Sequence, residues 1–117
     1  MKGYCGKILH VDLTNSEIWI EKPGEDFYRM YGGGTGMGTY YLLKLMPPRV
    51  DALSPENVIA IFTGPATGAA ISGQSRVAIV AKSPLTGGIG DSQGGGFWPA
   101  TFKRTGFDGM VITGKAP

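Results

Sequence analysis

The chain has 117 residues, of which 42% are hydrophobic and 17% charged, and its formal net charge is +2. This composition supplies enough apolar material for one folded domain over residues 1–117 and excludes a disordered chain. The small charge and the scattered basic residues argue against a nucleic-acid partner. No apolar run approaches the about 20 residues of a membrane helix, and no signal peptide is recognisable. A soluble cytoplasmic protein without a membrane partner is therefore expected.

The predicted elements begin with a β-hairpin and alternate between helices and strands. In chain order they are a hairpin over 8–22, a short helix over 23–32, a helix over 35–46, strands over 58–62 and 76–82, a helix over 97–104 and a strand over 109–113. The helix over 35–46 is expected to bury Tyr40, Leu43 or their neighbours against the strand over 58–62. This pattern predicts an α+β fold in which the sheet dominates.

Thirteen of the twenty glycines lie in three clusters, over residues 32–38, 64–68 and 87–96. None of the clusters has the spacing of a dinucleotide fingerprint or a P-loop. The run from Gly94 to Gly96 precedes the predicted helix over 97–104, where free backbone N–H groups favour an anion. Glycines also serve tight turns and close packing, and that reading stays open. Arg76, after a glycine-rich loop, suits a phosphate clamp or an exposed charge on an edge strand.

No catalytic group and no metal site can be assigned from residue spacing. The chain has a single cysteine, Cys5, and a single histidine, His10. One cysteine permits neither an intrachain disulfide nor a complete iron–sulfur ligand set. His10 lies inside a predicted strand without a second ligand nearby, so it is interpreted as a strand-face residue.

Six segments of the sequence, in this order, resemble the N-terminal domain of aldehyde ferredoxin oxidoreductases. They are "GKILHVDLTNSEI", "GGGTGMGTYYLLKLMP", "LSPEN", "TGPATG", "SGQSRVAIVAKSPLTGGIGDSQGGGF" and "FKRTGFDGMVITGKA". Each segment is weakly specific, but their combination covers nearly the whole chain. The resemblance implies a β-rich base, so that mostly antiparallel β-sheet with two or three packed helices is expected.

Members of this family are cytoplasmic tungsten enzymes that oxidise aldehydes to carboxylic acids and pass electrons to ferredoxin. The resemblance implies that a tungsten bis-pterin cofactor, with a magnesium bridging its phosphates, lies on the base domain. The family's arginine, asparagine and glycine contacts fall on Arg76, Gln93 and Gly95, and Gly94 adds bare backbone beside them. Gln93 is a departure, because its extra methylene displaces the amide by over an angstrom from where the family's asparagine holds it.

The family enzymes are several times longer, and the cysteines of their 4Fe–4S cluster correspond to positions beyond residue 117. We therefore expect the isolated chain to be inactive and to hold no complete cofactor. It would be a piece of a longer polypeptide, the product of a split gene, or a small subunit. The alternative is a non-catalytic binding or assembly module that kept the fold without the cofactor.

The expected partners are ferredoxin, for the complete enzyme, and a second copy of the chain. A homodimer is predicted to use either an exposed sheet edge or an uncovered sheet face. The strand over 109–113, which is apolar and uncharged, is the predicted edge.

Overall fold

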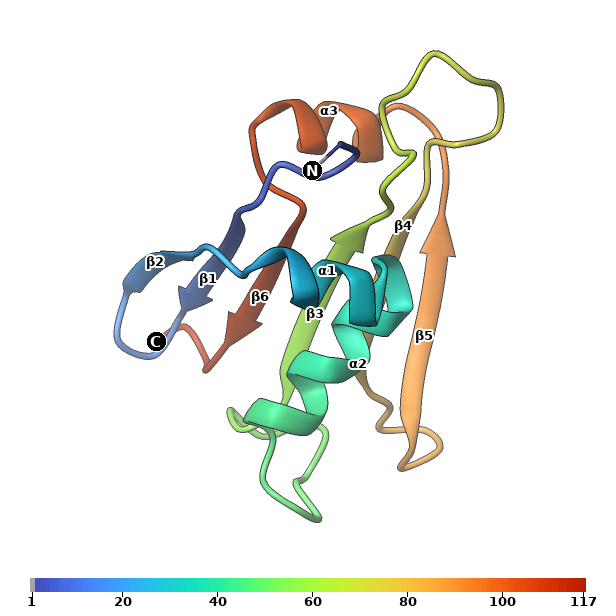
Figure 1. The fold of residues 1–117 in the computed structure, drawn as a ribbon. Helices are drawn as coiled ribbons and strands as arrows, with labels where there is room; N and C mark the ends of the chain where they lie inside the picture. Colours follow the sequence, from blue (N-terminus) through green and yellow to red (C-terminus); the bar gives the residue numbers. More distant parts are fainter. Residues whose placement is uncertain (1) are drawn as a thin grey trace.

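The computed structural model describes residues 2–117 and contains one six-stranded sheet and three helices (Figure 1). The strands are β1 (Ile8–Asp12), β2 (Glu17–Glu21), β3 (Val58–Thr63), β4 (Val77–Lys82), β5 (Ile89–Gly94) and β6 (Gly109–Thr113). The helices are α1 (Glu25–Tyr31), α2 (Gly34–Leu45) and α3 (Trp98–Arg104). The strand order is β2-β1-β6-β3-β4-β5. Only β1 and β6 pair in parallel within this sheet, which confirms the predicted α+β, mostly antiparallel fold.

One prediction about the strands was wrong, and one strand was not predicted. β6 lies between β1 and β3 in the middle of the sheet, whereas β2 and β5 are its edges. The apolar, uncharged sequence of β6 is therefore that of a central strand and not of an exposed edge. Strand β5 was not predicted, because its sequence IGDSQG has two glycines and three polar residues and follows no apolar pattern. It pairs with β4 through its backbone.

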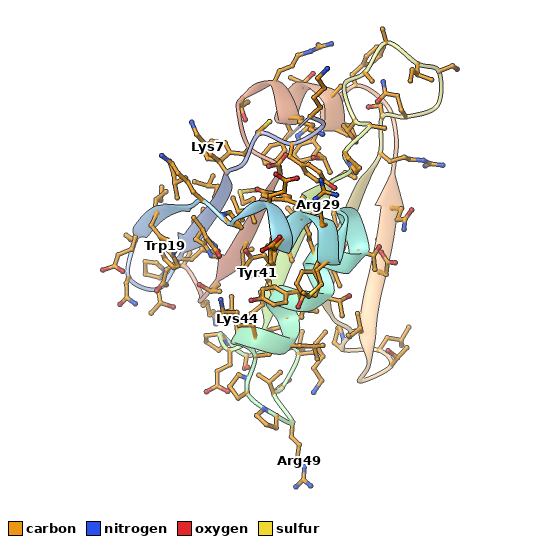
Figure 2. All side chains as sticks on the ribbon, in the orientation of Figure 1. Lys7, Trp19, Arg29, Tyr41, Lys44 and Arg49 are labelled. Carbon is orange, nitrogen blue, oxygen red and sulfur yellow. The ribbon has the colours of Figure 1, made fainter. Side chains whose placement is uncertain are left out.

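Helices α1 and α2 lie across one face of the sheet and close the hydrophobic core (Figure 1). From α2, Tyr41 and Leu42 are buried, and the Tyr41 ring stacks on Phe62 of β3 with a centroid distance of 5.6 Å. Tyr41 is among the side chains labelled in Figure 2. Leu43 points to solvent and is 73% exposed. The helix was therefore predicted correctly, but the residues that it buries against β3 are the neighbours of Leu43 and not Leu43 itself.

The close approach of α2 to the sheet depends on Gly38. A Cβ atom at this position would lie 2.7 Å from Cγ2 of Val80 in β4. The absent side chain lets the helix backbone pack directly on the strand. No helix within residues 2–117 is long and apolar enough to cross a membrane.

Asp108 ties three parts of the chain together at the start of β6. Its buried carboxylate accepts hydrogen bonds from the backbone N–H groups of Cys5 and Gly6, both at 2.8 Å, and from the Tyr28 hydroxyl at 3.0 Å. Burial and the neighbouring Asp108 carboxylate raise the pKa of Tyr28, which keeps its hydroxyl protonated as a donor. The N-terminal segment and α1 are thereby fixed to the central strand.

Asp12 closes the hairpin turn between β1 and β2. Its carboxylate accepts hydrogen bonds from the Asn15 side-chain amide at 2.8 Å and from the backbone N–H groups of Asn15 and Thr14 at 3.2 and 2.9 Å. These bonds, above all that from the Asn15 side chain, hold the pKa of Asp12 below its ordinary value. A carboxyl group whose pKa is lower in the folded than in the unfolded state stabilises the fold. This stabilisation is complete at pH values above the unfolded pKa of about 3.9, and it is lost as the pH falls through the folded pKa.

We therefore expect the Thr14 and Asn15 amide protons to be protected at pH 5, relative to their intrinsic exchange rates, and to lose this protection once Asp12 is protonated. Titration of the Asp12 carboxyl by NMR measures this directly. An Asp12 midpoint at or above its ordinary value would contradict the assignment.

Candidate functional site

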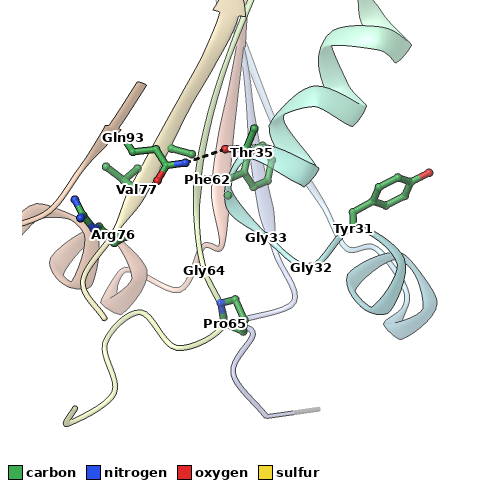
Figure 3. A pocket seen from close by; sticks show the side chains of 12 residues that line it. Tyr31, Gly32, Gly33, Thr35, Phe62, Gly64, Pro65, Arg76, Val77 and Gln93 are labelled. Carbon is green, nitrogen blue, oxygen red and sulfur yellow. Dashed lines mark hydrogen bonds between the residues drawn. The ribbon is translucent and has the colours of Figure 1, made fainter. Parts of the chain in front are cut away.

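A concavity of about 340 Å³ opens where the start of α2 meets the ends of β3, β4 and β5 (Figure 3). One wall consists of glycine backbone. Gly32 and Gly33 precede α2, Gly34 is the first residue of α2, and Gly64 follows β3. The opposite wall carries two polar side chains, Arg76 and Gln93. The concavity thus combines bare main chain with one cation and one amide.

The glycine wall is made by two of the three glycine clusters. A Cβ atom on Gly33 would lie 2.9 Å from the carbonyl oxygen of Thr63 and 3.3 Å from Cα of Gly64. The two backbones therefore touch at a distance that only glycine permits without displacement. Bare backbone on this wall also lets a flat ligand lie directly against the main chain.

Arg76 stands at the head of β4, immediately before Val77, which pairs with Gly94 of β5. A Cβ atom on Gly95 would lie 3.7 Å from Nη1 of Arg76, so the guanidinium lies over this glycine. Arg76 is exposed, and within residues 2–117 its guanidinium has neither a hydrogen-bond acceptor nor a carboxylate partner. Its five donors are free for a planar anion such as a carboxylate or phosphate.

Gln93 is positioned by a short chain of hydrogen bonds that links β5 to α2. Its Nε2 donates to the Thr35 hydroxyl at 3.3 Å, drawn as the dashed line in Figure 3. The Thr35 hydroxyl in turn donates to Oδ2 of Asp91 at 2.9 Å. Because the amide nitrogen is engaged, Oε1 of Gln93 is the atom available to a ligand. Gln93 therefore offers an acceptor beside the donors of Arg76.

Of the four predicted site residues, Arg76 and Gln93 line the concavity, whereas Gly94 and Gly95 lie beside them outside its lining. Gly94 is the last residue of β5, and α3 begins only at Trp98 after Phe97. The start of α3 does not contribute to the concavity. The Gly94–Gly96 run therefore precedes α3 without forming its first turn, and an anion site there stays a prediction. The run continues the edge strand β5, and because its glycines have no side chains they leave space beside Arg76.

Lys103 of α3 fixes the loop after β3, whose residues Gly64 and Pro65 line the concavity. Its Nζ donates to the carbonyl oxygens of Gly64 at 2.6 Å, Pro65 at 3.2 Å and Gly3 at 2.7 Å. Burial lowers the pKa of Lys103 below its ordinary value, although the nearby carboxylate of Asp108 opposes that shift. The loop after β3 is thereby fastened to α3 and to the N-terminal segment.

The sequence pointed to part of this site only. Gly32–Gly34 and Gly64 were noticed as clusters, but nothing in the sequence joined them to Arg76. Thr35 and Lys103 gave no signal at all, because a threonine after glycines and a lysine in a short helix are common at surfaces. Within residues 2–117, no three His, Cys, Asp or Glu side chains are grouped to hold a metal ion.

The fold and the concavity define an α+β domain in which bare glycine backbone faces one arginine and one glutamine side chain. The family model described as "Aldehyde ferredoxin oxidoreductase, N-terminal domain" matches residues 8–117, and the chain belongs to this family.

Several relatives are similar over 99% of this chain. It is 45% identical over 116 residues to the tungsten-containing aldehyde ferredoxin oxidoreductase of Pyrococcus abyssi and 38% identical over 119 residues to the WOR-like subunit of an aliphatic sulfonate oxidoreductase of Pyrococcus furiosus. The chain spans 19% of the length of each.

A solved structure, the active site complex BamBC of benzoyl coenzyme A reductase with 1,5-dienoyl-CoA, is similar with a TM-score of 0.94 and 32% identity. The match covers 99% of this chain and 18% of that chain. Relatives named for different substrates therefore share this domain.

Proposed function

We propose that this domain is part of the base for a tungsten bis-pterin cofactor in an oxidoreductase that converts aldehydes to carboxylic acids with ferredoxin as electron acceptor. The observation that carries the proposal is the unpartnered Arg76 facing bare glycine backbone in one concavity, in a chain 45% identical to a tungsten-containing aldehyde ferredoxin oxidoreductase. The proposed aldehyde substrate is taken from the names of relatives, since relatives named for other substrates share the same domain.

The residues present fit a pterin with a phosphate. Arg76 would hold the phosphate through its free donors, and Gln93 would accept a hydrogen bond through Oε1. The bare backbone at Gly33, in the wall of the concavity, and at Gly95, beside Arg76, would let a ring or a phosphate lie against the main chain. A tungsten–pterin centre supplies the oxidation–reduction chemistry when it is bound. The role of this chain is to bind and orient the cofactor, and the metal ligands and the 4Fe–4S cluster would belong to the rest of the enzyme.

The test is the cofactor content of the native protein that carries this domain, purified from cells supplied with tungstate. We expect Arg76→Ala to lower bound pterin and tungsten about tenfold or more, since a charge-assisted hydrogen bond contributes roughly 1.5–3 kcal/mol. Arg76→Lys keeps the charge but loses the planar pair of donors, so an intermediate content is expected. Pterin is measured by fluorescence after oxidation, and tungsten by mass spectrometry.

Arg104→Ala, which removes an exposed arginine of α3 outside the concavity, is the matched control and is expected to leave the cofactor content unchanged. Equal pterin content in the Arg76→Ala and control proteins would overturn the role of Arg76. A native protein free of both pterin and tungsten would instead support the alternative, a binding or assembly module that kept the fold without the cofactor.

We propose in addition that this chain works in the cytoplasm and self-associates as a homodimer. The support for self-association is a large apolar surface on the side of the sheet that α1 and α2 leave open.

A further inference from the structure

A second concavity, of about 310 Å³, opens at the end of β4 that lies away from Arg76. Its walls come from the end of α2, from the loop over residues 46–50 and from the turn between β4 and β5. Most of its lining is aliphatic, including Leu42, Met46 and Ile89. Its volume is at the lower end of the range of about 300–1,000 Å³ that is usual for small-molecule sites. We call it the Lys82 pocket.

The walls of the Lys82 pocket are held by hydrogen bonds. In the β4–β5 turn, the Ser83 N–H donates to the carbonyl oxygen of Gly88 at 2.7 Å, and the Gly87 N–H donates to that of Ser83 at 2.9 Å. The Asn57 side chain accepts from the backbone N–H of Lys82 at 3.2 Å and donates to its carbonyl oxygen at 3.1 Å. The pocket is therefore preformed, and a ligand loses little affinity to the ordering of its walls.

The Lys82 ammonium group is the charged group in the wall of this pocket. The side chain is half-buried, and its Nζ donates a hydrogen bond to the carbonyl oxygen of Val50. An ammonium group has three donors, so two remain for a ligand. Within residues 2–117, no carboxylate forms an ion pair with Lys82. A half-buried cation without a counter-ion is stabilised by an anion that approaches it.

Arg49 adds a second positive charge at the rim. Its backbone has a φ of 58°, which is uncommon for a residue other than glycine. Its exposed side chain is labelled at the lower end of Figure 2 and forms no ion pair with a carboxylate of the described chain. Lys82 and Arg49 are the charged residues of the lining, and no acidic residue is among the residues that line the pocket. The pocket is therefore complementary to an anion.

The combination of aliphatic walls with one half-buried ammonium group selects the chemistry of the ligand. Ile89 is the cross-strand partner of Lys82, so the two side chains lie next to each other on the same face of the sheet. A neutral hydrocarbon would leave the ammonium group unpaired. A phosphate dianion would bring two charges to a single half-buried cation and would leave the aliphatic wall without a partner. A carboxylate with an aliphatic tail satisfies both parts.

We infer that the Lys82 pocket binds an aliphatic monocarboxylate, which accepts a hydrogen bond from Nζ of Lys82 and packs its tail against Leu42, Met46 and Ile89. This site is separate from the concavity at Arg76. The six residues of β4 lie between the two, so they are roughly 15–20 Å apart. The inference does not depend on the proposed cofactor role.

Protection of the Lys82 amine from acetylation tests the inference on the native protein that carries this domain. The probe is octanoate, and the matched probes are octanol, which lacks the charge, and acetate, which lacks the tail. We expect octanoate, at ten times its dissociation constant, to slow acetylation of Lys82 about tenfold, because that fraction of the pockets remains free. The exposed Lys22 is the internal control, and its acetylation is expected to stay unchanged. Mass spectrometry of peptides measures both rates.

A pair of variants ties the protection to the pocket. Ile89→Glu places a carboxylate beside Lys82 and is expected to abolish protection by octanoate. Ile71→Glu changes an isoleucine that is 67% exposed and lies outside the pocket, so protection is expected to persist. Circular dichroism verifies that both variants are folded.

Three results would overturn the inference. The first is equal acetylation of Lys82 with and without octanoate, or a Lys82 that the rest of the native protein covers and keeps unreactive. The second is equal protection by octanol or by acetate, and the third is protection that persists in Ile89→Glu. None of these bears on the cofactor role, because the pterin and tungsten contents are measured independently.

Discussion

Replacing Asp108 with alanine is expected to lower the free energy of unfolding by about 3 kcal/mol or more. The carboxylate is 2% exposed and accepts three hydrogen bonds, from Cys5, Gly6 and Tyr28. Each buried donor that loses its acceptor costs about 1–3 kcal/mol. The Tyr28 hydroxyl contributes most to this loss, because its residue is 1% exposed and water cannot readily replace the carboxylate. Chemical denaturation followed by circular dichroism measures the change.

Two variants make this result specific. Asp108→Asn keeps one acceptor oxygen and is expected to be intermediate. Asp51→Ala removes an exposed loop carboxylate that accepts one hydrogen bond, from the Leu53 N–H at 2.9 Å, and is expected to cost only about 1 kcal/mol. An Asp108→Ala protein as stable as the Asp51→Ala protein would show that water or a rearranged N-terminal segment replaces the carboxylate.

Gly109→Ala is expected to destabilise the fold by about 1–3 kcal/mol through steric overlap. Gly109 is the first residue of β6, and a Cβ atom there would fall within the ring of Phe62 on the neighbouring strand. Phe62 is fully buried and stacks on Tyr41, so its ring cannot move away without opening the core. The same denaturation experiment measures the effect.

A double-mutant cycle identifies the cause. Phe62→Leu removes the ring, so Gly109→Ala is expected to cost less in that background than in the natural sequence. Gly88→Ala is the control, since a Cβ atom at Gly88 meets only ordinary contact, 3.7 Å from the Thr86 hydroxyl. Additive costs for Gly109→Ala and Phe62→Leu would contradict the steric explanation.

Most of the fold could be predicted because hydrophobic periodicity reflects burial. β3, β4 and β6 are continuous apolar runs, and the proline pair after α2 ends that helix. β5 could not be predicted, because an edge strand that is held by backbone hydrogen bonds needs no apolar side chains. The position of β6 could not be predicted either, since an uncharged apolar strand has the same sequence at an unprotected edge and at the centre of a sheet.

The site could be predicted only at residues whose type and immediate sequence neighbours indicate a ligand. Arg76 beside glycines suggested an anion, and the resemblance added Gln93, Gly94 and Gly95. The glycine wall opposite them comes from segments far away along the chain, so its approach to Arg76 depends on the packing of α2 on β3 and β4. Single-sequence patterns carry no information on such long-range contacts.

The parallel pairing of β1 with β6 affects how the protein is made. The first and last strands of the sheet are neighbours, and β6 alone joins the β1–β2 hairpin to β3, β4 and β5. At about 5–20 residues per second on the ribosome, β1 waits roughly 5–20 s for its parallel partner. During that time the hairpin has no sheet to join, and a two-stranded hairpin is marginally stable by itself. Folding is therefore a late event, completed when the last strand inserts between two halves that were synthesised before it.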